Sequence, residues 1–585
     1  MIDHKNINKF ITVLVVLAIV CITAFLLWHG SASGSAASGL TMGYETSLFD
    51  TENIIDIDVS ISDDDWKDLL ENPTDETYYT CDVTVNGTTY SNVGFRAKGN
   101  TSLSMVASSD SDRYSFKIKF DKYDDNLTCD GLTSLVLNNN YSDATMMKEA
   151  LTYDMFQYLG ADSSLYNYAK VSVNGEYYGV YLALEPVEES FAMRNYGSDY
   201  GNLYKPDSMN MGGAGKMNDF SPSEVKDALP DFSNNNNDGN TPAPPDLDKQ
   251  ANQDSPSDQD SRQGSTDGQA SQGMKDSQNR KDIQDSTNDQ DTQNKQGHQG
   301  KPGASGFGKP NDQGGPGGKG GQKPDGGFGS SDSSANLNYI DDDLDSYETI
   351  WDASVFKSSD SDHQKVVTAL KNICSEDAST DSLAEYMDVD NILRYMAVQT
   401  FVVNLDSLTG NMPHNYYLYE KDSELNIIPW DYNLSYGGFQ SGSADDVINF
   451  PIDTPFSESI SLEDRQFFMA LLNNETYLAQ YHEYLSQLVE YVQNGKLDAV
   501  YDRITSQIDN LVKTDPTAFY TYDEYTAAKE MLKETISLRA ESIQGQLDGT
   551  IPSTWEGQSK DSSSLIDTSS IDLSVMGMQG GGQDG

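Results

Sequence analysis

Two loop carboxylates stand beside strand-like runs in the second half of the chain. Asp406 lies in the polar loop NLDSLTGNMPHN, which leads directly into the aromatic run YYLY. Asp431 follows the apolar run NIIPW and enters a turn that also holds Asn433 and two glycines. Mg²⁺ takes few protein oxygens and demands near-octahedral geometry, so oxygens fixed at strand ends suit it. The pattern indicates a candidate magnesium site; the alternative is that both acids only cap their turns.

The order of the polar residues along the chain is a second signal. Asp406 comes first, His414 and Asn415 come directly before the aromatic run, and Asp431 follows the next strand-like run. A loop Asp, a loop Asn, two strands and a turn Asp is the order in which protein kinases present a catalytic base and two magnesium ligands. The expected chemistry is therefore phosphoryl transfer.

The charge of the chain limits its partners. Among 585 residues, 38 are Lys or Arg and 92 are Asp or Glu, which gives a formal net charge of −54. Phosphate neutralisation needs clustered Lys and Arg, so the composition argues against nucleic acid as a partner. The acidity suits a solvated, extracytoplasmic protein, or one whose partners are basic.

The N-terminal sequence predicts a membrane anchor. Residues 1–9 carry two lysines, and the apolar run at 10–28 is long enough to cross a bilayer as a helix. The lysines place the N-terminus in the cytoplasm and the folded part outside it. We expect a retained signal anchor with a linker at 29–44; cleavage of the signal would instead give a secreted protein.

Three cysteines follow the apolar run: Cys81, Cys129 and Cys374. They show neither C-x-x-C spacing nor His partners at zinc-finger spacing, so a zinc site is not expected. Two alternatives stay open, which are one disulfide between Cys81 and Cys129, or buried free thiols.

The first half of the chain, residues 45–206, is predicted to form a strand-rich lobe. Alternating apolar and polar residues predict strands, and Asn-Gly pairs at 86–87 and 174–175 predict two hairpin turns of type I′. At 143–160 the apolar residues change to helical spacing, with Asp143 as N-cap and Gly160 as stop. Strands, one helix and further strands predict an α+β fold.

The rest of the chain divides by composition. Residues 207–336 are almost pure Gly, Asp, Gln, Asn, Ser, Pro and Lys; they cannot bury enough apolar surface to offset the entropy of ordering, so disorder is expected. Residues 337–549 carry apolar-periodic segments that predict a mostly helical lobe. Residues 550–585 are polar, and a flexible tail is expected.

Several motifs in both predicted lobes point to one protein family. They are FRAKGNTS at 95–102, YSFKIKF at 114–120, MMKEALTYDMF at 146–156, VNGEYYGVYLALEPV at 173–187, GNLYKP at 201–206, and above all LDSLTGNMPHNYYLY with IPWDYNLSYGG. On these motifs the chain resembles the CotH kinase family. The resemblance implies a two-lobed atypical protein kinase fold, and ATP- and Mg²⁺-dependent phosphorylation of Ser or Thr on surface or spore-coat proteins.

The resemblance also implies roles for single residues. Asp406 resembles the catalytic acid that orients or deprotonates the acceptor hydroxyl, and Asp431 resembles the metal-binding acid. Asn415 resembles the metal-binding Asn, with Asn411 as second choice because it keeps the ordinary D-x-x-x-x-N spacing. No Gly-rich G-x-G-x-x-G loop is present, so residues 99–102 are expected to cover the phosphates.

Four further residues are candidates for holding ATP: Lys98, Lys117, Lys148 and Glu185. Lys98 and Lys117 are candidates for the cation beside the α- and β-phosphates. Lys148 opens the predicted helix next to Glu149, where a kinase keeps its ion-pair Glu. Glu185 ends a strand and resembles the hinge acid of the family.

Two functions are compatible with this sequence. The first is a membrane-anchored extracytoplasmic Ser/Thr protein kinase. The alternative is a non-catalytic cell-surface adhesion or structural protein on the same fold, because fold does not fix function. The converging oxygen ligands favour the enzyme, whereas the anchor, the long spacer and the acidic composition motivate the alternative.

Overall fold

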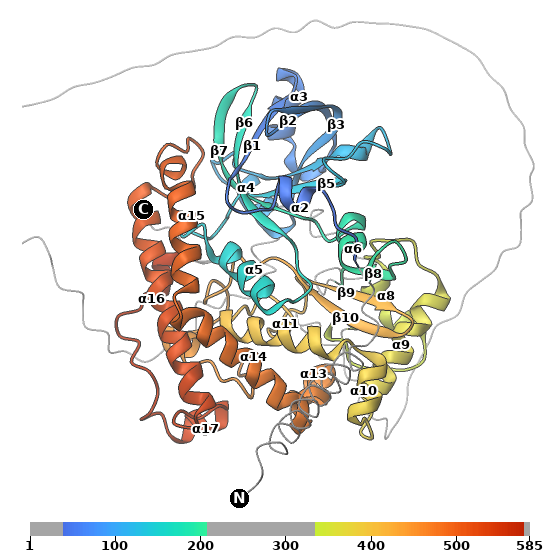
Figure 1. Cartoon of the computed structure of the whole chain (residues 1–585), viewed down its shortest axis with the longest axis vertical. Helices are drawn as coiled ribbons and strands as arrows, with labels where there is room; N and C mark the ends of the chain where they lie inside the picture. Colours follow the sequence, from blue (N-terminus) through green and yellow to red (C-terminus); the bar gives the residue numbers. More distant parts are fainter. Residues whose placement is uncertain (1–38, 207–333, 578–585) are drawn as a thin grey trace, which may run out of the picture. The chain divides into compact units, whose positions relative to one another are not determined.

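Strands and helices are both present in the parts of the chain that the structure describes. The structure is a computed structural model, and it describes residues 39–206 and 334–577. Most strands lie in the first range, whereas the second range is mostly helical (Figure 1). The predicted α+β class is therefore confirmed.

Seven strands of the first range close into a barrel. Their order around the barrel is β1-β2-β3-β4-β5-β7-β6, and a parallel pairing of β1 with β6 closes the ring. The sequence predicted strands but not closure, because the β1–β6 pairing joins segments far apart in the chain. The bounds are β1 Ile55–Ser60, β2 Tyr79–Val85, β3 Thr88–Lys98, β4 Ser115–Lys119, β5 Ser134–Asn138, β6 Tyr166–Val173 and β7 Glu176–Leu184.

The two predicted hairpin turns are confirmed. Asn86 and Gly87 join β2 to β3 with φ angles of 49° and 83°, and Asn174 and Gly175 join β6 to β7 with φ angles of 51° and 82°. A type I′ turn needs positive φ at both central positions, and the pair Asn-Gly adopts it at low cost. The first turn fixes the register of β2 with β3, the strand that carries Lys98, and the second fixes the register of β6 with β7.

Helix α5, Lys148–Leu159, corresponds to the helix predicted at 143–160. It begins later than predicted, but the Asp143 carboxylate still accepts a hydrogen bond from the Lys148 backbone N–H at 3.1 Å. Gly160 ends the helix with a φ of 72°, as predicted. Four shorter helices were not predicted: α2 Tyr44–Ser47, α3 Asp63–Glu71, α4 Thr101–Ala107 and α6 Glu189–Tyr196.

A second sheet joins the two described ranges. Strand β8, Asn202–Tyr204, pairs antiparallel with β9, Tyr416–Lys421, and β9 pairs antiparallel with β10, Glu424–Pro429. Helix α11, Val389–Val402, is buried along most of its length and packs against β10 and α5. Because α11 leads into the Asp406 loop, this packing fixes where the loop begins.

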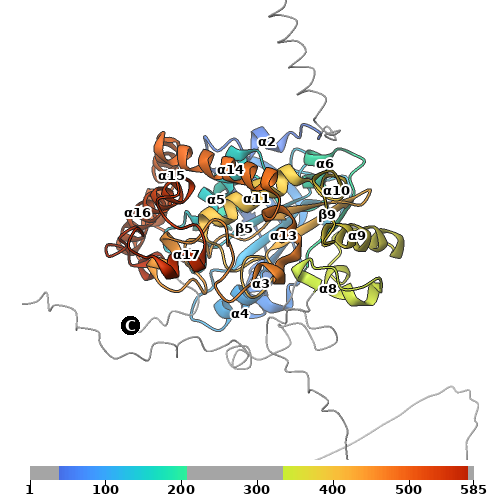
Figure 2. The same ribbon diagram turned by 90° about the horizontal axis from the view of Figure 1, so that it is seen from below.

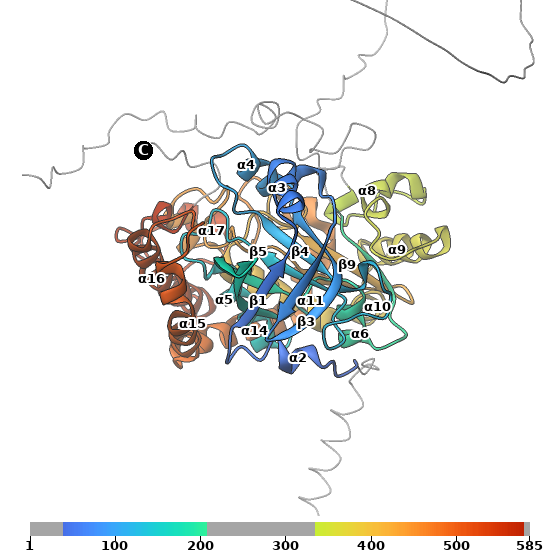
Figure 3. The same ribbon diagram turned by 90° about the horizontal axis from the view of Figure 1, so that it is seen from above.

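The remaining helices surround α11. Helix α14 packs against α11, α15 and α16. Seen from below (Figure 2) and from above (Figure 3), α15 and α16 lie on the side opposite to α8 and α9. The bounds are α8 Glu348–Trp351, α9 Asp360–Ile373, α10 Thr380–Tyr386, α12 Ala444–Ile448, α13 Gln466–Leu472, α14 Glu475–Gln493, α15 Lys496–Lys513, α16 Tyr522–Leu547 and α17 Trp555–Lys560.

The segment after α16 corrects the prediction of a flexible tail at 550–585. Helix α17 and the short 3₁₀ helix η8, Leu573–Met576, follow α16, and Leu573 and Met576 are buried. The few apolar residues of this polar segment are enough to attach it to the core. Ser334, Ala335 and Asn336, which were assigned to the predicted insertion, form a short 3₁₀ helix and are buried. The rest of the predicted disordered insertion, 207–333, lies outside the described residues.

Two other expectations concern the cysteines and the membrane. Cys81, Cys129 and Cys374 are free, so the disulfide alternative was wrong; Cys81 and Cys129 are buried free thiols as the second alternative has it, whereas Cys374 is partly buried. Burial raises the pKa of Cys81 to about 12. Within 39–206 and 334–577 no helix has the length and apolarity needed to cross a bilayer, and the predicted anchor at 10–28 falls outside these ranges.

A buried ion pair ties the barrel to the C-terminal helices. Arg113 lies just before β4 and Asp515 lies just after α15, and their side chains are 1% and 0% exposed. Arg113 Nη1 donates to Asp515 Oδ2 at 2.8 Å and to Thr517 Oγ1 at 2.9 Å. The Val180 N–H donates to the same Asp515 oxygen at 3.0 Å. The pair therefore joins β7 and the start of β4 to the α15–α16 connection.

We expect Arg113→Met to lower the free energy of unfolding by about 3–5 kcal/mol, because it leaves the Asp515 carboxylate buried without its counter-charge. Lys67→Met is the matched control, since Lys67 and its partner Glu71 are 72% and 62% exposed. That control should leave the free energy nearly unchanged. Urea unfolding of the full chain measures both variants, and equal effects would contradict the assigned role of Arg113.

Candidate functional site

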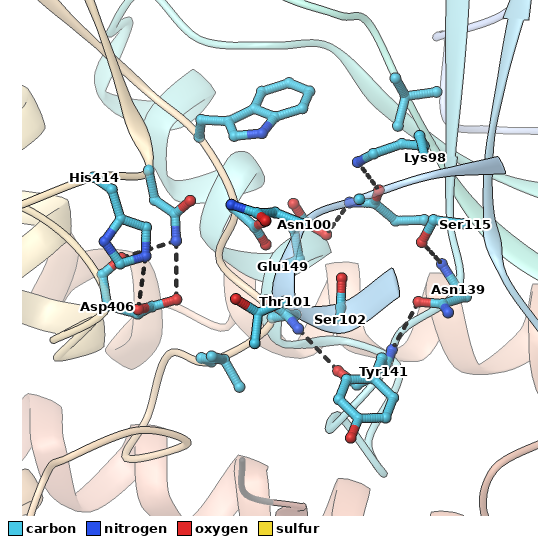
Figure 4. Close-up of a pocket in the computed structure, with 18 of the residues that line it drawn as sticks. Lys98, Asn100, Thr101, Ser102, Ser115, Asn139, Tyr141, Glu149, Asp406 and His414 are labelled. Atoms are coloured by element: carbon cyan, nitrogen blue, oxygen red, sulfur yellow. Dashed lines mark hydrogen bonds and ion pairs between the residues drawn. The ribbon is translucent and has the colours of Figure 1, made fainter. Parts of the chain in front are cut away.

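A cavity of about 400 Å³ contains most of the residues that the sequence analysis selected. Its walls come from β3, β4 and β5 of the barrel, from the start of α5, and from the loops that flank β9 and β10. Figure 4 shows Lys98 on one side of the view and Asp406 with His414 on the other. The predicted residues that line the cavity are Lys98, Lys117, Asp406, Asn415 and Asp431.

The barrel contributes cations because of the period of its strands. On β3, Phe95 and Ala97 point into the barrel core, so the alternate residues Arg96 and Lys98 face outward toward the cavity. The register of β4 places Lys117 opposite Arg96. Two adjacent strands therefore present three cations to the same cavity.

Two of these cations are held by carboxylates. Arg96 forms an ion pair with Glu76, and Lys117 forms one with Glu188. Burial disfavours ionisation of Glu188, but the charge and the hydrogen bond of Lys117 hold the pKa of that carboxyl below its ordinary value. Glu188 was not predicted; its signal in the sequence is its place in the short segment that follows β7, which ends at Leu184.

Asp406 is fixed by two neighbours from the same loop. His414 Nε2 lies 2.9 Å from Asp406 Oδ1, and Asn415 Nδ2 donates to Asp406 Oδ2 at 2.9 Å. His414 Nδ1 lies 2.7 Å from the carbonyl oxygen of Met412, which can only accept, so Nδ1 donates there. The carboxylate of Asp406 is thus oriented before any ligand binds. His414 was noted in the sequence but given no role.

Asp431 reaches the cavity directly after β10. It has a φ of 64°, and its backbone oxygen accepts a hydrogen bond from Asn404 Nδ2 at 3.4 Å. Burial raises the pKa of the Asp431 carboxyl, the ammonium of Lys98 counteracts this, and the nearby Asp406 raises it further. The two acids therefore repel each other across the cavity, and a cation between them would relieve that repulsion.

Lys98 and Glu149 are connected through Asn138. Lys98 Nζ donates to Asn138 Oδ1 at 3.1 Å, and Asn138 Nδ2 donates to Glu149 Oε2 at 2.9 Å. Burial lowers the pKa of Lys98, which the charge of Asp431 opposes. Burial, followed by the charge of Asp431, raises the pKa of Glu149 to about 8. The sequence analysis named Glu149 as the position of an ion-pair Glu, and it does lie in the cavity near Lys98.

Lys205 is a further cavity cation that the sequence analysis missed. Its Nζ lies 5.6 Å from the ring centre of Tyr417 and 5.9 Å from that of Trp430. Lys98 Nζ lies 5.7 Å from the same Trp430 ring. The ammonium groups of Lys98 and Lys205 therefore both lie over the Trp430 ring, whose electron-rich face attracts them. The signal for Lys205 was the GNLYKP motif, whose lysine directly follows β8.

Three predicted site residues do not line the cavity. Lys148 is buried and its ammonium donates to the Gly577 backbone oxygen at 3.0 Å. Glu185 is buried and binds Arg194 Nη2 at 2.6 Å. Asn411 is exposed and accepts a hydrogen bond from Ser459 Oγ at 3.1 Å. Lys148 and Glu185 thus make structural contacts, and of the two asparagines Asn415 lines the cavity whereas Asn411 does not.

The donor set of the cavity fits Mg²⁺ with a polyphosphate. Among the described residues, no group of three or more His, Cys, Asp and Glu side chains could hold a metal ion alone. Mg²⁺ is usually bound through one or two carboxylates, with waters and substrate phosphates completing its shell. Asp431 and the Asn415 amide oxygen meet that need, and Lys98, Lys117 and Lys205 supply positive charge. Glu149 Oε1, a buried oxygen without a hydrogen-bond partner in the described part, fits a site completed by a ligand.

Comparison with known proteins gives two matches. A family model described as "CotH kinase protein" matches residues 95–297 and 319–543, which together exceed half of the chain. The protein "Inner spore coat protein H" of Bacillus subtilis (strain 168) is 35% identical over 77 residues, which are 13% of this chain. The match covers 21% of that relative, so the chain aligns with well under two thirds of it.

We expect Glu149 to make stability depend on pH. Its pKa is raised from 4.5 to about 8, so the folded state keeps a proton that the unfolded state releases in this window. The stability that the raised pKa of Glu149 contributes is fully present below pH 4.5, and it is lost as the pH rises through about 8. Glu149→Gln should therefore flatten the fall in melting temperature between about pH 5 and pH 8, measured without Mg²⁺.

Glu188→Gln is the control for this experiment. The pKa of Glu188 is lowered, so this carboxyl titrates below about pH 5. Replacing it should therefore leave the slope of melting temperature against pH unchanged between about pH 5 and pH 8. A slope that is identical in wild type and Glu149→Gln would contradict a protonated, buried Glu149.

Proposed function

Because the chain belongs to the CotH kinase family, we propose that it transfers the terminal phosphoryl group of ATP to Ser or Thr hydroxyls of a protein. The observation that carries this proposal is the meeting of Lys98 and Lys117 from the barrel with Asp406 and Asp431 in one cavity. Phosphoryl transfer needs little covalent chemistry from the protein. It needs cations for the phosphates, oxygens for the metal and an acid for the acceptor.

Asp406 has the geometry for the acceptor hydroxyl. His414 lies 2.9 Å from one of its carboxylate oxygens, and Asn415 donates to the other at 2.9 Å, so the carboxylate cannot turn freely. In this role Asp406 accepts the hydrogen bond of the Ser or Thr hydroxyl and takes its proton as the oxygen bonds to phosphorus. Positioned general bases of this kind contribute about 10²–10⁴-fold to rate.

Asp431 and the amide oxygen of Asn415 are the candidate Mg²⁺ ligands. The β9–β10 register pairs Tyr416 with Pro429, so Asn415, directly before β9, and Asp431, two residues after Pro429, lie at the same end of the hairpin. Mg²⁺, when bound, supplies charge that stabilises the transferred phosphoryl group. The charge of Asp406 beside Asp431 increases the attraction of this end for a cation.

Lys98 is the candidate for the cation that holds the phosphates. It lines the cavity and is partly buried there, donates to Asn138, and is attracted by both Asp431 and Glu149. Lys117 and Lys205 are the supporting cations. The charges of Asp431 and Glu149 both act on Lys98, and Asn138 connects Lys98 to Glu149, a placement that resembles the lysine and helix glutamate of a kinase.

The proposed kinase arrangement divides the fold into two lobes. The barrel with α5 is the lobe that covers the nucleotide, and residues 334–577 are the lobe that carries Asp406 and Asp431. Residues 99–102 line the cavity just before and at the start of α4, where they take the place of a Gly-rich loop. Their backbone amides and the hydroxyls of Thr101 and Ser102 are the groups that would contact phosphate oxygens.

The name of the relative supports a proposal for the acceptor and the location. Its name, inner spore coat protein H, supports a coat or cell-surface protein as acceptor and a site outside the cytoplasm. The acidic net charge of −54 supports a basic acceptor. Anchoring through the apolar run at 10–28 remains a prediction from the sequence, and protease protection in membrane vesicles would test it.

The direct test is phosphate transfer by the full chain. With γ-labelled ATP, Mg²⁺ and a Ser-rich basic protein, we expect label on the acceptor, and a loss of at least about 100-fold in Asp406→Ala. Asp431→Ala and Asn415→Ala should lower the affinity for Mg²⁺ and so raise the Mg²⁺ concentration that half-maximal transfer requires. Asn411→Ala is the matched control for Asn415→Ala, because Asn411 lies in the same loop but outside the cavity.

Two outcomes would contradict the proposal. Full transfer by Asp406→Ala and Asp431→Ala would remove both acids from the mechanism. Neither label nor Mg-nucleotide binding by the folded wild-type chain would favour the non-catalytic adhesion protein instead.

A further inference from the structure

Residues 571–577, called here the C-terminal strap, return to the rear of the cavity walls. The strap contains the 3₁₀ helix η8, and it packs against α16. Leu573 and Met576 are buried, and Thr535 Oγ1 lies 3.9 Å from the Met576 sulfur. This anchors the strap on the long C-terminal helix, from which it reaches two segments that line the cavity.

The first of these segments is the turn that begins α5. The Ala144 N–H donates to the Met576 backbone oxygen at 3.1 Å, and Lys148 Nζ donates to the Gly577 backbone oxygen at 3.0 Å. The strap thus accepts one neutral and one charge-assisted hydrogen bond from this turn. Charge-assisted hydrogen bonds are roughly twice as strong as neutral ones, so Lys148 is the stronger attachment.

Lys148 connects the strap to the catalytic cavity through its neighbour in sequence. Lys148 is turned to the strap, while Glu149, the next residue, lines the cavity and accepts from Asn138, which in turn binds Lys98. The order of contacts is therefore Gly577, Lys148, Glu149, Asn138 and Lys98. A displacement of the strap would move the first turn of α5, and with it the carboxylate that faces Lys98.

The second segment is the turn that follows Asp431. Gly437 lies in this turn with a φ of 83°, and a Cβ atom placed there would be 2.9 Å from Leu573 Cδ1. The Leu573 side chain therefore packs directly on the backbone of the turn. Asn433, Leu434 and Phe439 of the same turn line the cavity. One short strap thus supports both the α5 wall and the Asp431 wall.

Gly577 is the residue that allows this close contact. It has a φ of 81°, and a Cβ atom there would lie 2.6 Å from the Ser142 backbone oxygen and 3.0 Å from the Ala144 backbone nitrogen. Both atoms belong to the backbone of the turn, so they cannot move aside as a flexible side chain would. Only glycine lets the strap approach the turn closely enough for the two hydrogen bonds to form.

We propose that the C-terminal strap is a positioning element that holds Glu149 and the Asp431 turn in place and thereby sets the affinity of the cavity for Mg-nucleotide. The inference rests on the proposed function for the identity of the ligand. Lys148, which was a candidate for holding ATP on sequence, is in this account a positioning residue that acts through Glu149. The strap contributes no atom to the cavity; it fixes the two walls from behind.

The test compares two glycine substitutions in the full chain. Gly577→Ala introduces the backbone clash, whereas Gly549→Ala, at a similar φ of 71°, has no atom within 4 Å of the new Cβ. Both variants bear the cost of a left-handed alanine, so only the clash differs between them. We expect Gly577→Ala to bind a fluorescent ATP analogue with Mg²⁺ about tenfold more weakly than wild type, and Gly549→Ala to bind it as wild type does.

Hydrogen exchange on the same three proteins supplies a readout that does not depend on ligand binding. In Gly577→Ala we expect faster exchange at 144–149 and at 431–439, in addition to the strap itself. Faster exchange confined to the strap, with unchanged exchange at both walls, would overturn the inference. Coupled exchange together with no nucleotide binding by wild type would instead overturn the proposed function and leave the mechanical coupling established.

A variant that changes the attachment and not the glycine separates positioning from direct binding. Lys148→Met removes the ammonium but no cavity-lining group, so in this account it loosens the α5 wall in hydrogen exchange and weakens nucleotide binding together. Weaker binding in Lys148→Met with unchanged exchange at 144–149 would contradict the inference and favour a direct contact between Lys148 and the nucleotide.

Discussion

The structure depends on a cation, Lys98, that lies partly buried among carboxylates from both described ranges. Burial lowers the pKa of Lys98 and raises those of Asp431 and Glu149, while the attraction between Lys98 and these acids opposes both shifts. A buried charge is costly unless it is paired. Separation of the barrel from the β9–β10 loops would leave Lys98 and Asp431 without each other, so the charges that serve the site also hold its two walls together.

Strand alternation and hairpin register bring these charged side chains to the cavity. Strand alternation turns Lys98 out of the barrel, and the β9–β10 register brings the Asn415 and Asp431 positions to one end of a hairpin. The walls are then braced away from the cavity, by the Arg113–Asp515 pair at the barrel and by the C-terminal strap behind α5. An oriented, partly desolvated site of this kind suits phosphoryl transfer, in which positioning and electrostatics supply most of the catalysis.

Local signals in the sequence were sufficient to predict several turns, one helix end and the loops that carry the two acids. The Asn-Gly turns, the end of α5 at Gly160, and the place of Asp406 and Asp431 beside strands were predictable, because each depends on a few neighbouring residues. Barrel closure, the strap and the structural contacts of Lys148 and Glu185 depend on residues far apart in the chain, and no short motif encodes them. Lys148 was a candidate for holding ATP because it opens the predicted helix beside Glu149; only the fold shows that the two side chains serve opposite sides of the same turn.

The central claim is that Lys98 and Asp431 act on one bound nucleotide, and a double-mutant cycle tests it most directly. Mg-ATP affinity would be measured for wild type, Lys98→Met, Asp431→Asn and the double variant. Groups in one network show coupling energies of about 0.5–3 kcal/mol, and the account predicts a value in this range, with the double variant little weaker than the worse single one. Strictly additive losses, or affinities that neither substitution changes, would contradict a shared site.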